Sequence, residues 1–137
     1  MNIDELQAGP VLDALVAERV MEWTKIKSMC GLVRSDSSWL DKRTGCRKAQ
    51  KHWSPSTDIA AAWEVWEALP REYKPLSNIG ITWGITDSHY MFHPNGERVY
   101  ICQGILDCGE IKWHAEAETA PLAICRMALK YKTEAHP

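Results

Sequence analysis

The sequence lacks any long apolar run: its 137 residues contain no stretch of the roughly 18 apolar side chains that a membrane helix needs. The N-terminus carries Asn2, Asp4 and Glu5, whereas a secretory signal peptide begins with positive charge. We therefore expect a cytoplasmic protein that makes no contact with a membrane.

Closely spaced cysteine pairs and phosphate-binding loops are missing as well. The five cysteines are an odd number for a disulfide framework and include no Cys-x-x-Cys knuckle of the kind that structural zinc sites use. Neither GxxxxGKS/T nor GxGxxG occurs, which excludes the common phosphate loops. We expect reduced thiols, no metal and no cofactor.

Catalytic groups can be assembled from the sequence, but no catalytic motif stands out. Asp87, Ser88 and His89 supply a carboxylate, a hydroxyl and an imidazole, but successive residues of a strand point to opposite faces. We therefore predict no catalytic residue. The alternative is an enzyme whose site gathers His89, His93, Cys108 and His114.

Positive charge, by contrast, is abundant in one segment. Residues 23–52 carry eight basic and two acidic side chains, although the net charge of the whole chain is −2. Cations neutralise phosphates and aromatic rings accept stacked bases, so this composition favours an anionic ligand or partner. A solvated loop kept soluble by its charge is the alternative. The predicted contact set is Trp39, Lys42, Arg43, Arg47, Lys48, Lys51, His52 and Trp53.

Apolar residues at helical spacing predict three helices. The first begins at Pro10 and runs for about 13 residues with Asp13 facing solvent, and a short turn precedes it at residues 2–5. The second is capped by Ser56 or Thr57 and buries a stripe of Ile59, Ala62, Trp63, Trp66 and Leu69. The third follows the cap residue Thr119 and buries Leu122, Cys125, Ala128 and Leu129.

Alternating patterns predict strands between the second and third helices. They cover residues 78–85, a hairpin of residues 90–92 and 99–101 around Pro94-Asn95-Gly96, and residues 110–115. Residues 30–53 show no period and are interpreted as a basic loop excursion. Together these elements predict one α+β domain over residues 1–137.

Three blocks, in order along the chain, carry a family resemblance. They are MNIDELQAGPVLDALVAERVMEW, SPSTDIAAAWEVWEAL and AEAETAPLAICRMALK. With these blocks the chain resembles the phage ABA sandwich domain family, small proteins of bacteriophages and prophages. The resemblance implies a three-layer helix/sheet/helix sandwich with a mostly antiparallel sheet, and it carries over no catalytic residue.

The resemblance and the basic segment together favour a phage accessory protein that acts by binding in the cytoplasm of a bacterial host cell. Its role would be counter-defence, either by occluding a host defence protein or nucleoprotein or by sequestering an anionic nucleotide. Two alternatives stay open. One is a small hydrolase or transferase acting on a nucleotide or peptide, and the other is a structural module that self-associates through some of its seven tryptophans.

Overall fold

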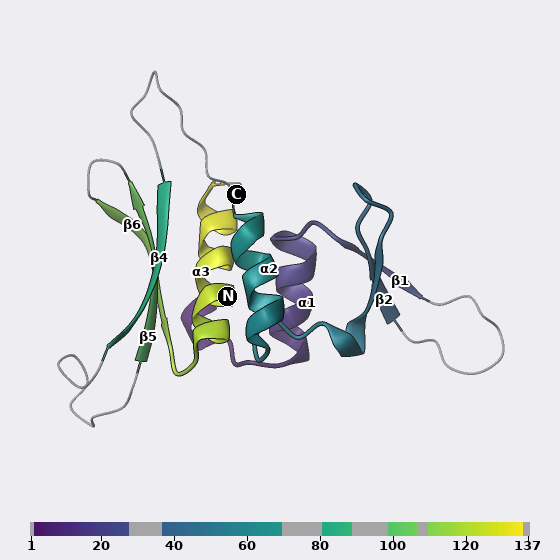
Figure 1. The fold of residues 1–137 in the computed structure, drawn as a ribbon, viewed down its shortest axis with the longest axis horizontal. Helices are drawn as coiled ribbons and strands as arrows, with labels where there is room; N and C mark the ends of the chain where they lie inside the picture. Colours follow the sequence, from purple (N-terminus) through teal and green to yellow (C-terminus); the bar gives the residue numbers. More distant parts are fainter. Residues whose placement is uncertain (1, 28–36, 70–80, 89–98, 107–109, 136–137) are drawn as a thin grey trace, which may run out of the picture.

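The computed structural model describes residues 2–27, 37–69, 81–88, 99–106 and 110–135. Three helices stand side by side, with a three-stranded antiparallel sheet on each flank (Figure 1). The predicted α+β class and the antiparallel strands are confirmed, and so is a build of three layers. The helices form the middle layer of this sandwich, and the sequence did not predict the second sheet.

The N-terminal part begins with a short helical turn, η1 (Ile3–Glu5), followed by α1 (Pro10–Arg19). The side chain of Asn2 accepts the backbone N–H of Asp4 at 3.1 Å, which caps η1. Pro10 occupies the first position of α1, where a helix has no use for its missing N–H. Both starts were predicted from the sequence and are confirmed.

Asp13 lies on the inner side of α1, so the prediction that it faces solvent was wrong. Its carboxylate is buried and accepts the backbone N–H of Ser56 at 2.9 Å. The hydroxyl oxygen of Ser56 in turn accepts the N–H of Gly9 at 3.0 Å. These hydrogen bonds fix the start of α1 against the segment that enters α2. The burial of Asp13 could not be predicted from residue spacing within α1, because its partner Ser56 lies 43 positions away in the sequence.

The second helix, α2, spans Ile59–Ala68. Its cap is Asp58, whose side chain accepts the N–H of Ala60 at 3.1 Å. The predicted caps Ser56 and Thr57 were therefore wrong, because Ser56 is turned inward to Gly9 and the Thr57 hydroxyl donates to the carbonyl of Ser54. Any of three neighbouring cap-type residues fitted the sequence pattern equally well.

The buried face of α2 is rotated from the predicted stripe. Ile59 and Trp63 were expected in the core but are 44% and 43% exposed. The buried residues of the helix are Ala61, Ala62, Val65 and Trp66. Apolar side chains occupy so many positions of α2 that spacing alone does not determine which face turns inward.

The third helix, α3 (Ala120–Ala135), is the central element of the core. It packs against β5 and β6 on one side and against α1 and α2 on the other. The predicted cap is confirmed, since the Thr119 hydroxyl accepts the N–H of Leu122 at 3.4 Å. At 16 residues α3 is the longest described helix, and no helix in the described ranges has the length and apolar character needed to cross a membrane.

The larger sheet contains β4 (Ile81–Ser88), β5 (Val99–Leu106) and β6 (Ile111–Ala117) in that order. The strands predicted around residues 78–85 and 110–115 correspond to β4 and β6. Residues 90–92 and the turn Pro94-Asn95-Gly96 lie outside the described ranges. A register shift at Gly104 marks a bulge between β5 and β6.

The smaller sheet contains β1 (Thr24–Lys27), β2 (Ser37–Leu40) and β3 (Arg47–Ala49), and the short helix η2 (Gln50–His52) follows it. The interpretation of residues 30–53 as an irregular loop was wrong for β2, β3 and η2, and β1, which precedes that range, was not predicted. Each is only three or four residues long, too short for alternation to stand out from the surrounding sequence.

Candidate functional site

The turn between β2 and β3 is held together from within. The N–H of Asp41 donates to the carbonyl of Cys46 at 3.0 Å, and Gly45 supplies the left-handed backbone that the turn needs, with φ +72°. The Asp41 carboxylate accepts the backbone N–H of Arg43 at 3.0 Å, a hydrogen bond that lowers the pKa of this carboxyl group. The turn therefore presents the exposed side chains of Lys42 and Arg43 from an ordered backbone.

Alternation along β3 sends two predicted contact residues to opposite faces of the small sheet. Lys48 pairs across the sheet with the buried Trp39, whereas Arg47 pairs with Leu40 on the other face. On the inner side, the Lys48 ammonium forms an ion pair with the carboxylate of Glu64 on α2. Arg47 is exposed, and Lys48 joins the hairpin to the helix layer.

The same ammonium lies 5.6 Å from the ring centroid of Trp23, within the range of a cation–π contact. Lys48 therefore has a carboxylate and an aromatic face as intramolecular partners. This residue has a structural role in the protein, and less of its charge is left for an external anion.

Trp39 and Trp53 belong to the core. Their exposed fractions are 1% and 2%, and the Trp53 ring lies 4.6 Å from that of Trp23, centroid to centroid. As placed, neither indole can stack on a base, which corrects the sequence expectation for these two residues. The sequence has no local signal that separates a tryptophan in the core from one that lines a ligand site.

The remaining predicted contact residues share one property, exposure. Lys51 and His52 lie on η2, directly after β3, and both are exposed. We use the name cationic hairpin surface for the four exposed cations of this region, which are Lys42, Arg43, Arg47 and Lys51. The predicted segment thus has a positively charged surface, but the two tryptophans predicted to flank it, Trp39 and Trp53, are buried.

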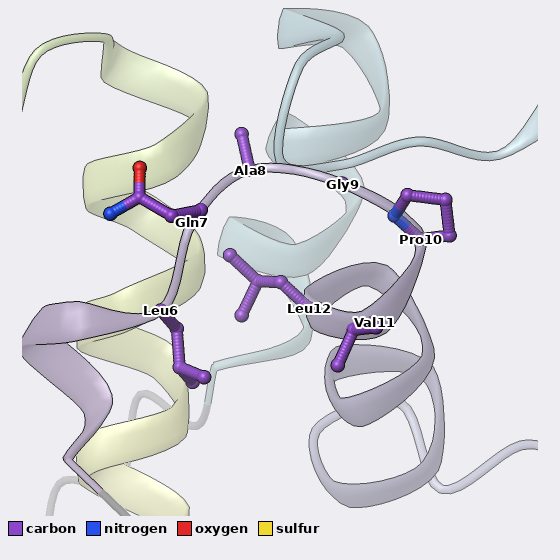
Figure 2. A pocket seen from close by; sticks show the side chains of 7 residues that line it. All are labelled: Leu6, Gln7, Ala8, Gly9, Pro10, Val11 and Leu12. Carbon is purple, nitrogen blue, oxygen red and sulfur yellow. The ribbon is translucent and has the colours of Figure 1, made fainter.

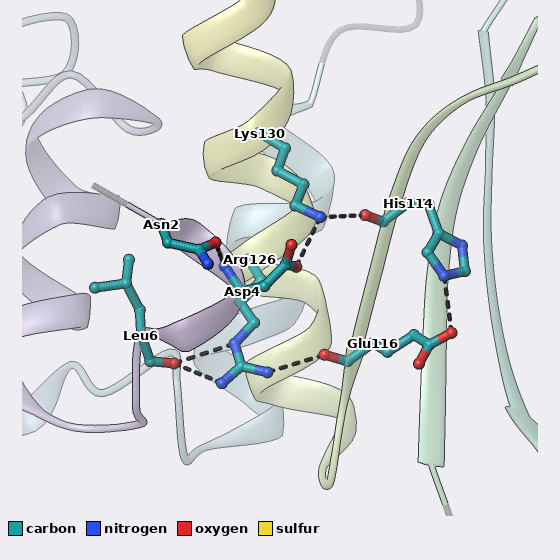
Figure 3. Close-up of polar contacts among 7 residues, drawn as sticks. All are labelled: Asn2, Asp4, Leu6, His114, Glu116, Arg126 and Lys130. Carbon is teal, nitrogen blue, oxygen red and sulfur yellow. Dashed lines mark hydrogen bonds and ion pairs between the residues drawn. The ribbon is translucent and has the colours of Figure 1, made fainter. Parts of the chain in front are cut away.

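A second polar cluster joins the N-terminal segment to β6 (Figure 3). The Lys130 ammonium pairs with Asp4 at 2.7 Å and donates to the carbonyl of His114 at 2.7 Å. The Arg126 guanidinium donates to the carbonyl of Glu116 at 2.9 Å and twice to that of Leu6, at 2.7 and 3.1 Å. Two cations of α3 thus donate to backbone carbonyls of β6.

Sequence reasoning missed the role of this cluster. Arg126 is only 8% exposed, and an almost buried guanidinium is rare unless it is paired. The only signal in the sequence is the spacing of Arg126 and Lys130, four apart on one face of a helix. A hollow of about 350 Å³ opens beside the cluster, lined by Asp4, His114, Glu116 and Lys130.

His114 is the one described member of the alternative enzyme site, because His89, His93 and Cys108 lie outside the described residues. Its Nδ1 is 3.1 Å from Gln103 Nε2, and its Nε2 is 3.0 Å from a Glu116 carboxylate oxygen. Among the described residues, no hydrogen bond joins this imidazole to a serine, threonine or cysteine. The described part of the cluster therefore contains a base but no nucleophile hydrogen-bonded to it.

A second hollow, of about 250 Å³, lies at the start of α1 (Figure 2). Residues 6–12 line it, and Figure 2 shows the side chains of Leu6, Leu12 and Val11 along the path of the chain. None of the lining side chains is charged. This hollow therefore offers apolar contact and no catalytic group.

Two of the described thiols are buried and one is exposed. Burial raises the pKa of Cys102 to about 12 and raises that of Cys125 as well, whereas Cys46 lies exposed in the β2–β3 turn. Within the described ranges, no three His, Cys, Asp or Glu side chains come close enough to hold a metal ion.

Three layers of helices and antiparallel strands around one core define the protein as an α+β sandwich. The chain belongs to the phage ABA sandwich domain family, whose model matches residues 14–129. No curated protein and no solved structure matches the chain. The family match supplies the fold and the phage association, and it assigns no functional residue.

Proposed function

We propose that this phage-family protein works without catalysis, by binding an anionic host partner through the cationic hairpin surface. The observation that carries the proposal is the set of exposed cations on the β2–β3 turn, β3 and η2, in a chain whose net charge is negative. Counter-defence is the role we propose for this binding, with occlusion of a host protein or nucleoprotein as its mechanism.

The turn favours binding because its backbone is already ordered. The hydrogen bond from the Arg43 N–H to Asp41 and the pairing of Asp41 with Cys46 fix the path of the chain that presents Lys42 and Arg43. A preorganised surface loses less conformational entropy when it meets its partner. Clustered charges of one sign also raise the rate of encounter with an oppositely charged surface.

Two observations favour an extended anionic face over a small nucleotide as the target. Trp39 and Trp53 are buried, so the hairpin has no indole on which a base can stack. Neither described hollow is lined by a residue of the cationic hairpin surface. Exposed cations that line neither of these hollows suit the surface of a macromolecule better than the enclosure of a small molecule.

The proposal is tested by removing charge at the hairpin and, as a control, elsewhere. The double variant Arg43→Ala/Arg47→Ala is compared with Arg19→Ala/Lys112→Ala, which removes the same net charge from α1 and β6. Capture of partners from a bacterial host lysate, followed by binding of the purified partner, should fall about tenfold or more only in the hairpin variant. Equal binding by both variants would contradict the proposal.

A further inference from the structure

The exposed face of α2 carries two large apolar side chains. Trp63 is 43% exposed and Ile59, one turn earlier, is 44% exposed, whereas the opposite face of the helix is buried and packs against α3. Residues four apart lie on one face of a helix, so the two form a short apolar strip toward solvent. Large apolar side chains that are exposed together mark a contact site more often than ones scattered singly.

A neighbouring ring orients the indole of Trp63. The two planes stand at 85° to one another, with the ring centroids of Trp63 and Trp66 5.6 Å apart, and Trp66 is only 9% exposed. This edge-to-face contact is one of the favoured aromatic geometries. Trp63 therefore presents a large contact area that loses little freedom on binding.

The charged side chains next to this apolar strip are acidic. Residues 54–69, which contain α2, include no lysine, arginine or histidine, and their three acidic residues are Asp58, Glu64 and Glu67. Asp58 directly precedes Ile59, and Glu67 lies one turn beyond Trp63 on the same face. The strip therefore has a carboxylate near each of its ends.

One cation reaches α2 from another element. Lys48 of β3 pairs with Glu64, and the two side chains remain 38% and 44% exposed. This ammonium offsets one of three carboxylates, so acidic side chains stay in excess along the helix. Oppositely charged groups are placed to face each other across interfaces. Charge complementarity therefore argues for a cationic occupant of this face.

We infer that Ile59 and Trp63 form a second docking surface, for a protein segment in which a bulky apolar side chain is flanked by Lys or Arg. The apolar side chain covers the strip, and the flanking cations meet the carboxylates of α2. Tryptophan is one of the residues that most often dominate the binding energy of protein interfaces. This surface differs from the cationic hairpin surface in its residues and in the sign of its charge, so it does not rest on the proposed function.

A nucleic acid and a second copy of this chain fit the surface less well. Stacking of bases on Trp63 brings phosphates toward the carboxylates, which repel them. The cationic hairpin surface of a second copy matches the carboxylates but not the strip. Among the described residues, the exposed large apolar side chains lie outside the hairpin, at Val11, Ile59, Trp63 and Ile111. A basic segment with an apolar side chain matches both features.

The test selects displayed random short peptides on the intact protein after depletion on a variant of the strip. Depletion on Trp63→Ser removes peptides that bind any other surface, the cationic hairpin surface included. Peptides that then bind the unchanged protein should combine a bulky apolar residue with flanking Lys or Arg. Cooperative thermal unfolding checks that Trp63→Ser is folded, and Ile59→Ser takes its place in the depletion if it is not.

The affinities of the enriched peptides locate the contact. They should fall about thirtyfold for Trp63→Ser, about tenfold for Ile59→Ser and about threefold for Glu67→Gln. Ile111→Ser and Glu18→Gln are the matched controls, because Ile111 is 50% exposed on β6 and Glu18 is exposed on α1. Both controls should bind the peptides as the unchanged protein does.

The double variant Arg43→Ala/Arg47→Ala separates this inference from the proposed function. It should bind the enriched peptides as the unchanged protein does, whether or not the hairpin binds an anionic partner. Loss of the peptides in this variant, no enrichment after depletion, or enrichment of Asp and Glu would overturn the inference. Undiminished binding by Glu67→Gln would overturn the choice of a basic partner, and tighter binding of a single-stranded oligonucleotide that depends on Trp63 would overturn the choice of a protein.

Discussion

At the scale of single residues, the side chains that hold this protein together include several that sequence patterns assign to the surface. Asp13 is buried against the segment before α2, and Arg126 donates to the carbonyl of Leu6, directly after η1, and to that of Glu116 in β6. In each case the partner is distant in the sequence. Helical spacing predicts polar residues to face solvent. It does not reveal a hydrogen-bond partner from a distant segment, which is what makes the burial of a polar side chain favourable.

Replacing Asp13 should destabilise the protein measurably. Asp13→Ala leaves the buried N–H of Ser56 without its acceptor, which costs about 1–3 kcal/mol of unfolding free energy. Denaturation in urea measures the change. Glu18→Ala, an exposed carboxylate on the same helix, is the control and should stay within about 0.5 kcal/mol of the unchanged protein. Equal effects of the two substitutions would show that the buried hydrogen bond contributes nothing.

The described thiols should differ in reactivity toward an alkylating reagent at about pH 8. The thiolate is the reacting form, and burial raises the pKa of Cys102 to about 12, so this thiol stays protonated and shielded in the folded protein. Cys46 is exposed in the hairpin turn and should react first. Peptide mapping by mass spectrometry after brief labelling checks this. Labelling of Cys102 as fast as Cys46 in the folded protein would be the opposite result.

At the scale of elements, the helices could be predicted from the sequence and the small sheet could not. Caps and apolar spacing place α1, α2 and α3 because a helix is defined by residues within a few positions of one another. The strands β1, β2 and β3 are short, and their pairing depends on contacts between segments. The candidate site could also be predicted only in part. Its cations were predicted from the sequence, whereas the burial of Trp39 and the exposure of Trp63 depend on packing between elements.

The link between the N-terminal turn and β6 gives a prediction at this scale. Arg126→Ala removes the guanidinium that donates to the carbonyls of Leu6 and Glu116, and it should lower the free energy of unfolding by about 2 kcal/mol. It should also speed hydrogen exchange in η1, because Arg126 holds that turn to β6.

Asp4→Ala serves as the comparison for this link. It removes the ion pair between Lys130 and the exposed Asp4 carboxylate, and pairs near solvent contribute about 1 kcal/mol or less. Chemical denaturation and hydrogen exchange of both variants decide the point. A larger loss for Asp4→Ala than for Arg126→Ala would contradict the assignment of Arg126 as the main connection.

At the scale of the whole molecule, one core serves two sheets. The buried cluster runs from Trp39 and Trp53 beneath the small sheet, through α3, to Trp113 and Ala115 of the large sheet. The cationic hairpin surface lies on the small sheet and on η2, which follows it. A stable scaffold with charge on one short hairpin suits binding, since the surface can vary without disturbing the core.

Ionic strength should modulate the proposed binding as a consequence of this arrangement. Charges on an exposed hairpin are screened within about 8 Å at physiological salt, so affinity for the partner should fall as salt is added. The dependence should be weaker in Arg43→Ala/Arg47→Ala than in Arg19→Ala/Lys112→Ala. Titrations at several salt concentrations measure the two slopes, and identical slopes would count against an electrostatic role for the hairpin.

The central claim is that the hairpin between β2 and β3 touches the partner. A photo-crosslinking amino acid placed at Thr44, an exposed turn residue between Arg43 and Gly45, tests it without removing a cation. The same group at Glu18, exposed on α1, is the control. On irradiation in host lysate, we predict a covalent adduct to a host macromolecule from position 44 and none from position 18. Adducts from position 18 with none from position 44 would contradict the account.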